Sequence, residues 1–111
     1  GMRRGDVVVV ALPGDLGKPR PAVVVQANVL NDSLRTILLC PISSFSSQPS
    51  FFRVSIAPAT QNGVLIAIEQ TLYKLQSANR TRIAQVIGRV DDATQQKLSR
   101  SIMLALALTN G

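Results

Sequence analysis

Apolar residues occur along most of the chain in short runs that turn-forming residues interrupt, a pattern typical of β-structure. Runs that are rich in β-branched residues and bounded by glycine, proline, asparagine or serine predict strands at 6–12, 22–26, 35–42, 51–57, 64–70 and 82–90. The first three runs lack polar alternation, which indicates strands buried on both faces. The segment 71–80 has no clear period, so its pattern predicts neither strand nor helix.

The period of the apolar residues changes after the last predicted strand. The segment 91–108 contains no glycine or proline and has apolar residues at helical spacing, which predicts a C-terminal helix. Its expected apolar face carries Leu98, Ile102 and Ala105. Asp92 and Gln95 have the spacing of a capping box at the start of this helix. Further apolar residues near its end indicate that it is either buried on more than one side or in contact with another subunit.

Short strands joined mainly by hairpin-length connections, followed by one helix, predict a mainly β fold: a small, curled antiparallel barrel with a C-terminal α-helix. A chain of 111 residues is long enough for one domain with its own core. We expect this single domain to span residues 2–111, because Gly1 precedes Met2, the expected native start.

Composition narrows the class of protein. Hydrophobic residues make up 46% of the chain and charged residues 16%, which is typical of a folded globular protein. Twelve Lys and Arg against six Asp and Glu give a net charge of +6, which favours a polyanionic partner such as nucleic acid or an acidic protein. No apolar run approaches the roughly 20 residues of a membrane span. Pro13 and Gly14 interrupt the first run before a signal peptide develops, so we expect a cytoplasmic location.

Cysteine and histidine content limits the possible chemistry. The single Cys40 excludes a disulfide within the chain, and the absence of histidine removes the usual zinc ligand sets, so we expect no metal site. The absence of histidine also removes the commonest general acid or base. Any proton transfer must therefore use a carboxylate, hydroxyl, arginine, lysine or water.

The stretch "GKPRPAVVV" is the first candidate for a functional site, because Lys18 and Arg20 stand among prolines directly before a buried strand. These cations are either solvated or hold an anion. An arginine fork suits a phosphate, since its planar donors meet two oxygens at once and stay charged at any working pH.

The order of motifs along the chain resembles the MazF/PemK family of toxin endoribonucleases over nearly its whole length. The motifs are "RGDVVVVAL", "RPAVVVQ", "LLCPISS", "GVLIAIEQ" and "IGRVDD" leading into a helix. The resemblance implies an SH3-like barrel of the CcdB/PemK type that forms a homodimer. It also implies cleavage of single-stranded RNA without metal or cofactor, leaving 2′,3′-cyclic phosphate and 5′-hydroxyl ends, and neutralisation by a cognate antitoxin.

The resemblance also implies catalytic residues. Arg20 matches the active-site arginine of the "RPA" motif, Ser43 stands where members often have threonine, and Glu69 matches the acid that the PemK branch uses as general base. Arg20 is expected to stabilise charge on the phosphate and Ser43 to position the substrate. Ala67 replaces an arginine of the PemK branch and the loop histidine is missing, so the general acid is unassigned.

Four residues are candidates for RNA binding outside this set. Lys18 and Arg53 would follow the RNA backbone, Ser44 matches the serine after Ser43 and would contact a phosphate, and Phe45 would stack a base.

Two other functions stay open at this stage. The first is a non-enzymatic poison that resembles the CcdB toxins, which trap DNA gyrase. Those proteins use a tryptophan-containing motif at the end of their helix, and this chain has no tryptophan. The second is a barrel that has lost catalysis and only binds RNA or a partner protein, which the change at Ala67 and the missing histidine allow.

Overall fold

The computed structural model describes residues 1–12, 17–43, 53–56, 68–71 and 75–108. Within these ranges the chain forms a seven-stranded sheet with two α-helices and one 3₁₀ turn. The strands are β1 (Asp6–Ala11), β2 (Pro19–Val24), β3 (Thr36–Ser43), β4 (Arg53–Ile56), β5 (Ile68–Thr71), β6 (Gln76–Asn79) and β7 (Ile83–Arg89). The helices are α1 (Asn28–Asn31), η4 (Arg80–Arg82) and α2 (Asp92–Ala105).

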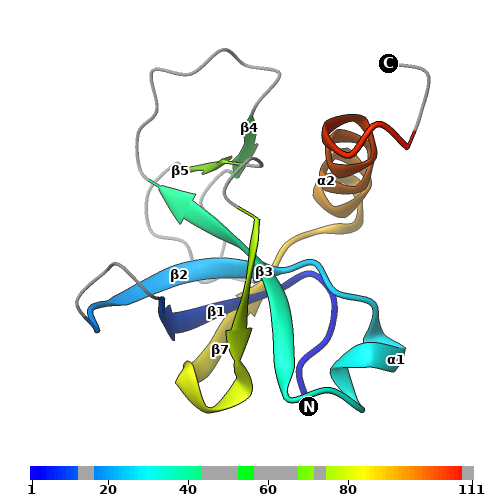
Figure 1. Cartoon of the computed structure of the whole chain (residues 1–111). Helices are drawn as coiled ribbons and strands as arrows, with labels where there is room; N and C mark the ends of the chain where they lie inside the picture. Colours follow the sequence, from blue (N-terminus) through cyan, green and yellow to red (C-terminus); the bar gives the residue numbers. More distant parts are fainter. Residues whose placement is uncertain (13–16, 44–52, 57–67, 72–74, 109–111) are drawn as a thin grey trace.

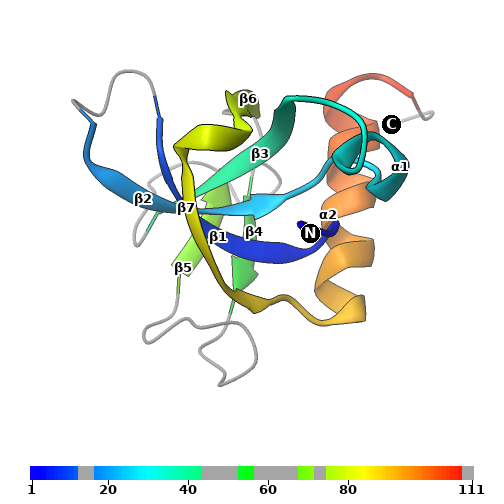
Figure 2. The same ribbon diagram turned by 90° about the horizontal axis from the view of Figure 1, so that it is seen from below.

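The sheet is antiparallel and strongly curled (Figures 1 and 2). Its strand order is β4-β5-β3-β2-β1-β7, and β6 pairs with the first half of β3 whereas β5 pairs with its end. The register of β1 with β7 shifts twice, and such irregularities bend a strand. The predicted mainly β fold with a C-terminal helix is therefore confirmed. Among the described residues β4 and β7 remain the two ends of the order, so the sheet is open there rather than a closed barrel.

The two faces of the sheet carry separate cores. Alternate residues of β1, β2 and β3 point to opposite faces, so an unbroken apolar run is buried on both. The helix face, against which α2 packs, contains Val7, Val23, Cys40, Ile42, Val90 and Leu98. The opposite face contains Val8, Val10, Leu12, Ala22, Val24, Ile37, Leu39 and Ala78. Burial of these strands on both sides confirms what their lack of polar alternation predicted.

The start of α2 differs from the predicted capping box. The N-cap is Asp91, not Asp92, and its carboxylate accepts a hydrogen bond of 2.8 Å from the Thr94 amide. Asp91 has an extended backbone, as a cap residue requires, whereas Asp92 already lies in the first turn. The Gln95 side chain instead donates to the Val90 carbonyl, at 3.3 Å. The helix also ends three residues before the predicted end, at Ala105.

Two elements were missed by the sequence patterns. The helix α1 lies between the second and third predicted strands, where the patterns predicted no helix. Polar contacts rather than an apolar stripe hold it in place: the buried Asn31 side chain donates to the Gln26 backbone carbonyl and accepts from the Gln26 side-chain amide. The strand β6 lies in the segment without a clear period, and only its pairing with β3 defines it. Residues 51–52, 57 and 64–67 of two predicted strands lie outside the described residues.

Gly5 is required by the backbone where the N-terminal segment passes α2. Its φ is +94°, its amide donates to the Val24 carbonyl and its carbonyl accepts from the Val90 amide. A Cβ there would lie 2.6 Å from Cδ of Gln95. We expect Gly5→Ala to lower the free energy of unfolding by about 1–2 kcal/mol through backbone strain. Denaturant unfolding measures this loss.

Gly17→Ala is the matched control for that change. Gly17 also has positive φ, at +77°, but a Cβ there would meet no atom of the described residues within 4 Å. Both variants therefore carry backbone strain, and only Gly5→Ala adds crowding against Gln95. A Gly5→Ala protein as stable as the parent would contradict the described approach of this segment to α2.

The Asp91 cap makes stability depend on pH. Hydrogen bonds from the Thr94 side chain and amide hold the pKa of this carboxyl below its ordinary value of 3.8. Because the folded-state pKa is the lower one, the stabilisation is present above the unfolded pKa and is lost as the pH falls through the folded value. We expect Asp91→Ala to lower the melting temperature by a few degrees at neutral pH and to melt more nearly like the parent near about pH 3. Asp91→Asn is expected to retain most of the cap without this pH dependence, and a parent-like pH dependence in Asp91→Asn would exclude Asp91 as its source.

Candidate functional site

Arg20 lies in the second position of β2, although the sequence pattern predicted it in a loop before the strand. The strand begins earlier because Pro19 and Pro21, whose φ is fixed near extended values, pair with Ala11 and Val9 of β1. Arg20 itself pairs with Val10 and is exposed.

Ser43 and Glu69, which are far apart in the sequence, are direct partners in the pairing of β3 with β5. Sequence motifs alone could not place these residues relative to each other, because their proximity depends on how the two strands are paired. The structure therefore brings two of the three predicted catalytic positions together.

Arg20 and Ser43 lie at the same end of the pairing between β2 and β3. That pairing ends with Ala22 opposite Pro41. Arg20 stands two residues before Ala22 and Ser43 two residues after Pro41, so both lie just beyond the last paired residues at that end. We call Arg20, Ser43 and Glu69 the catalytic row.

Arg20 lies on the face of the sheet that faces away from α2. Val10, the cross-strand partner of Arg20, is buried in the core of that face, as is Ala22, two residues along β2. Side chains two apart in a strand share a face. Arg20 therefore stands at the end of an apolar core and is exposed to solvent.

The strand β4 extends this arrangement. Ser55 pairs with Glu69, at the end of the catalytic row, and Arg53 pairs with Thr71, two residues further along β5. Arg53 was predicted to contact RNA, whereas Ser55 was not singled out for the site. Its signal was the alternation of the segment "FFRVSIA", which sets Arg53 and Ser55 on one face.

The remaining predicted site residues are placed less completely. Lys18 is exposed and directly precedes β2. Ser44 and Phe45 lie outside the described residues, as does Ala67. The structure places Ser43, Arg53 and Glu69 through their backbone pairing.

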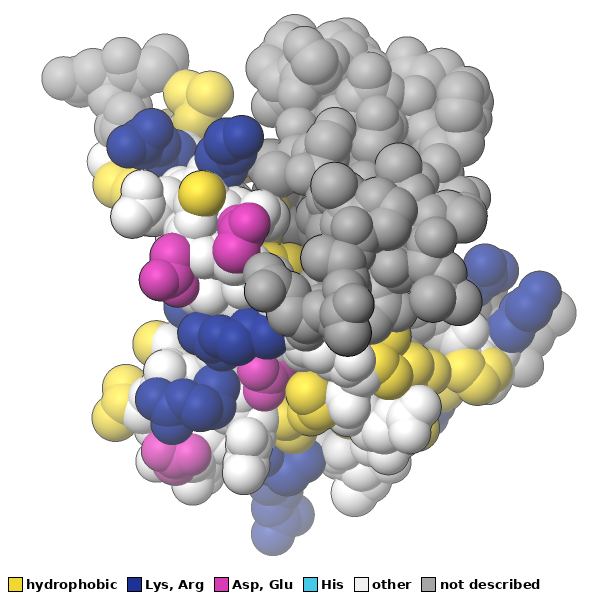
Figure 3. Space-filling view, turned by 180° about the vertical axis from the view of Figure 1, so that it is seen from behind, with side chains coloured by type: hydrophobic (Ala, Val, Ile, Leu, Met, Phe, Trp, Pro, Cys, Tyr) yellow, Lys and Arg dark blue, Asp and Glu magenta, His cyan; other side chains and the backbone are white. Residues whose placement is uncertain are grey.

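Charged side chains are mixed on the surface away from this site. Figure 3, viewed from behind, shows basic and acidic side chains interspersed along the side that carries α2 and the N-terminal segment. Arg89 and Asp6 form an ion pair there, at 3.3 Å. None of the helices in the described part of the chain has the length and hydropathy needed to cross a lipid bilayer.

Several solved structures share this fold. An endoribonuclease from a mycobacterial species, in complex with its cognate antitoxin, matches with a TM-score of 0.84 at 16% identity, and the match covers 100% of both chains. The Mycobacterium tuberculosis toxin MazF-mt6 matches with a TM-score of 0.79 at 17% identity, over 94% of this chain and 98% of that one. A MazE–MazF structure from Deinococcus radiodurans matches with a TM-score of 0.76 at 21% identity, over 97% of each chain. At these identities the likeness shows a common fold.

Comparison of the amino-acid sequence with family models shows which family the protein belongs to. The family model described as the PemK-like, MazF-like toxin of type II toxin–antitoxin systems matches residues 3–106, a range that contains every position of the catalytic row. With a match over nearly the whole chain, this protein belongs to the PemK-like, MazF-like toxins of type II toxin–antitoxin systems.

Proposed function

We propose that this toxin is a metal-independent, sequence-selective endoribonuclease that cleaves single-stranded RNA. The observation that carries the proposal is the pairing of Ser43 with Glu69 between β3 and β5, with Arg20 on the neighbouring strand β2 at the same end of its pairing with β3. A hydroxyl, a carboxylate and a phosphate-binding cation are the groups that transesterification of RNA needs. The names of similar structures as endoribonucleases support the same activity.

Each residue of the catalytic row has one role in this reaction. Glu69 removes the proton of the ribose 2′-hydroxyl, whose oxygen then attacks phosphorus. Arg20 binds the non-bridging oxygens and stabilises the charge that develops on them. Ser43 positions the reacting phosphate by a hydrogen bond. The bond from phosphorus to the 5′-oxygen breaks, that oxygen takes a proton from water or a further donor, and the products carry 2′,3′-cyclic phosphate and 5′-hydroxyl ends.

The surrounding residues provide contacts to the rest of the RNA. Lys18, which directly precedes β2, and Arg53 of β4 neutralise neighbouring phosphates. Ser44 contacts a phosphate, and Phe45 stacks a base. Because the substrate is cellular RNA, the proposal includes a cytoplasmic location.

The proposal also includes two protein partners. A cognate antitoxin with an acidic segment suits the net charge of +6, and two of the similar structures described above contain an antitoxin. A second copy of the chain suits the end of α2, where large apolar side chains are exposed. They are Met103, Leu104, Leu106 and Leu108. Burial of these residues in a homodimer would remove them from water.

Incubation of the purified protein with a long single-stranded RNA in excess EDTA tests the activity. We expect fragments with 2′,3′-cyclic phosphate and 5′-hydroxyl ends, clustered at a short sequence. Absence of cleavage from several unrelated RNAs would overturn the proposal in favour of a toxin that acts only by binding. Cleavage only after addition of a divalent cation would overturn the metal-independent mechanism.

A further inference from the structure

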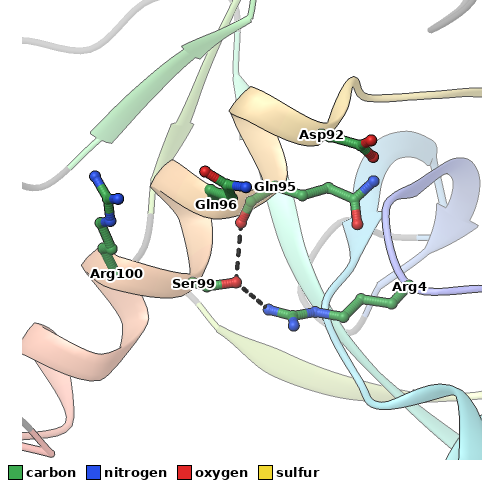
Figure 4. Close-up of a pocket in the computed structure, with 6 residues that line it drawn as sticks. All are labelled: Arg4, Asp92, Gln95, Gln96, Ser99 and Arg100. Carbon is green, nitrogen blue, oxygen red and sulfur yellow. Dashed lines mark hydrogen bonds between the residues drawn. The ribbon is translucent and has the colours of Figure 1, made fainter.

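A polar cavity lies between the N-terminal segment and α2, away from the catalytic row. Its volume is about 440 Å³. Every side chain that lines it is charged or carries an amide or hydroxyl: Arg4, Asp92, Gln95, Gln96, Ser99 and Arg100 (Figure 4). The cavity is next to α2, which covers the helix face, whereas Arg20 lies on the opposite face.

Arg4 is held in place by contacts at both its backbone and its side chain. Its amide donates to Oδ1 of Asn28 at 2.6 Å, and its carbonyl accepts from the Arg89 guanidinium at 2.9 Å. Its own guanidinium donates to Oγ of Ser99 at 2.6 Å, and that hydroxyl donates to the Gln95 carbonyl at 2.9 Å. A guanidinium with its position already fixed loses little conformational entropy when it binds a ligand.

Gln95 is fixed beside Arg4 by the close passage of Gly5. Its amide nitrogen donates to the Val90 carbonyl, and Figure 4 shows its side chain between Asp92 and Arg4. Arg100 lies further along α2, and its side chain points away from Arg4, so the two arginines stand at opposite ends of the cavity (Figure 4). Amide and guanidinium donors therefore line the cavity along its length.

The charges of the cavity favour an anion that also carries hydroxyl groups. Two arginines and one carboxylate line the cavity, and within the described ranges neither Arg4 nor Arg100 forms an ion pair. A nucleic-acid strand offers successive phosphates to cations that stand apart, which suits this set better than a single carboxylate does. The Asp92 carboxylate accepts hydrogen bonds from hydroxyl groups and repels a second carboxylate, which disfavours an acidic peptide.

We propose that this cavity is a secondary RNA site, in which Arg4 and Arg100 each bind a backbone phosphate of the same strand and Asp92 accepts a hydrogen bond from a ribose hydroxyl. The inference rests on the proposed function only in taking RNA as the ligand. The site holds a second stretch of strand beside α2, so that a long RNA binds more tightly than a short one that reaches only the catalytic row.

Equilibrium binding of a single-stranded RNA of about 15 nucleotides, followed by fluorescence anisotropy, tests this site. Every variant is made in an Arg20→Ala background, so that binding is measured without cleavage. Arg100→Gln is compared with Lys97→Gln, which removes the same charge from an exposed residue of the same helix outside the cavity. Arg4→Gln is compared with Arg3→Gln in the same way.

We expect Arg100→Gln and Arg4→Gln to weaken binding about 5–10-fold and each to reduce the salt dependence of binding by about 0.7 in the log–log slope, the value for one phosphate of a single strand. The two control variants are expected to change binding less than about twofold. Equal losses in cavity and control variants would overturn the site, because diffuse charge would then explain them. An acidic peptide that displaces the RNA and loses affinity on Arg100→Gln would overturn it in favour of a protein ligand.

These outcomes are independent of the cleavage assay. A protein that fails to cut RNA in EDTA can still show the specific loss on Arg100→Gln, which would support the secondary site while removing the endoribonuclease proposal. Cleavage by the parent, together with equal losses of RNA binding in all four variants, would support the endoribonuclease proposal and overturn the secondary site. Melting temperatures of the four variants check that each is folded, and Arg100 makes no hydrogen bond in the described structure that its replacement would break.

Discussion

Arg20→Ala is expected to reduce the rate of RNA cleavage by about 10³-fold, because it removes the group that stabilises charge on the reacting phosphate. Arg20 is exposed at the edge of the core, so its replacement leaves the apolar packing of β1 and β2 intact. The parent and variant are compared in single-turnover cleavage of one RNA in EDTA. Melting temperature and dimer content are measured on the same samples.

Two further variants separate the effect of the planar geometry of the Arg20 guanidinium from the effect of its charge. Lys18→Ala removes a neighbouring exposed cation outside the catalytic row and is expected to weaken cleavage less than about tenfold, mainly through RNA binding. Arg20→Lys retains the charge but not the planar fork, so we expect it to recover only a small part of the lost rate. Full activity of Arg20→Ala would show that Arg20 has no part in the mechanism. Equal losses of cleavage rate in Lys18→Ala and Arg20→Ala would show that Arg20 contributes only its positive charge.

The strands of the core could be predicted from the sequence because a strand that is buried on both faces has an unbroken run of apolar residues. Val7, Val8, Val23 and Val24 are apolar without interruption, and each is fully buried. The helix α2 was predicted for a similar reason, since Leu98 recurs at helical spacing with its apolar neighbours and is 2% exposed. Long runs with one period therefore identified the elements that carry the core.

Short elements held by polar or long-range contacts were not predicted. The helix α1 depends on hydrogen bonds between Gln26 and Asn31. Such contacts produce no periodic pattern of apolar residues in the sequence. The cap of α2 was predicted one residue late because Asp91 and Asp92 are chemically identical, and only the extended backbone of Asp91 distinguishes them.

The candidate site was predictable in its residues but not in its geometry. Arg20, Ser43 and Glu69 were chosen through motifs, whereas their placement relative to one another depends on how three strands pair, and that pairing is set across the whole sheet. Ser55 shows the same limit, because its partnership with Glu69 exists only once β4 pairs with β5. The motifs thus identify residues with the right chemistry, and the pairing of the strands determines where these residues lie relative to one another.

The register gives Glu69 two possible roles that one substitution separates. As the partner of Ser43 and Ser55, Glu69 stands at the centre of three strands, where a carboxylate can either act as the base or accept hydrogen bonds that hold the strands together. Glu69→Gln retains the size of the side chain and its ability to accept hydrogen bonds, but it removes the basic oxygen.

If Glu69 is the base, Glu69→Gln reduces cleavage by about 10²–10⁴-fold, and the residual rate no longer falls at acid pH as a base becomes protonated. Its melting temperature then stays close to that of the parent. Ser55→Ala is the control, since it changes the other neighbour of Glu69 without removing a proposed catalytic group, and it is expected to cleave RNA within about tenfold of the parent. A Glu69→Gln protein that cleaves RNA normally but melts at a lower temperature would show that this carboxylate supports the strands. The proton of the 2′-hydroxyl would then have to leave through water, with Arg20 as the principal catalytic group of the row.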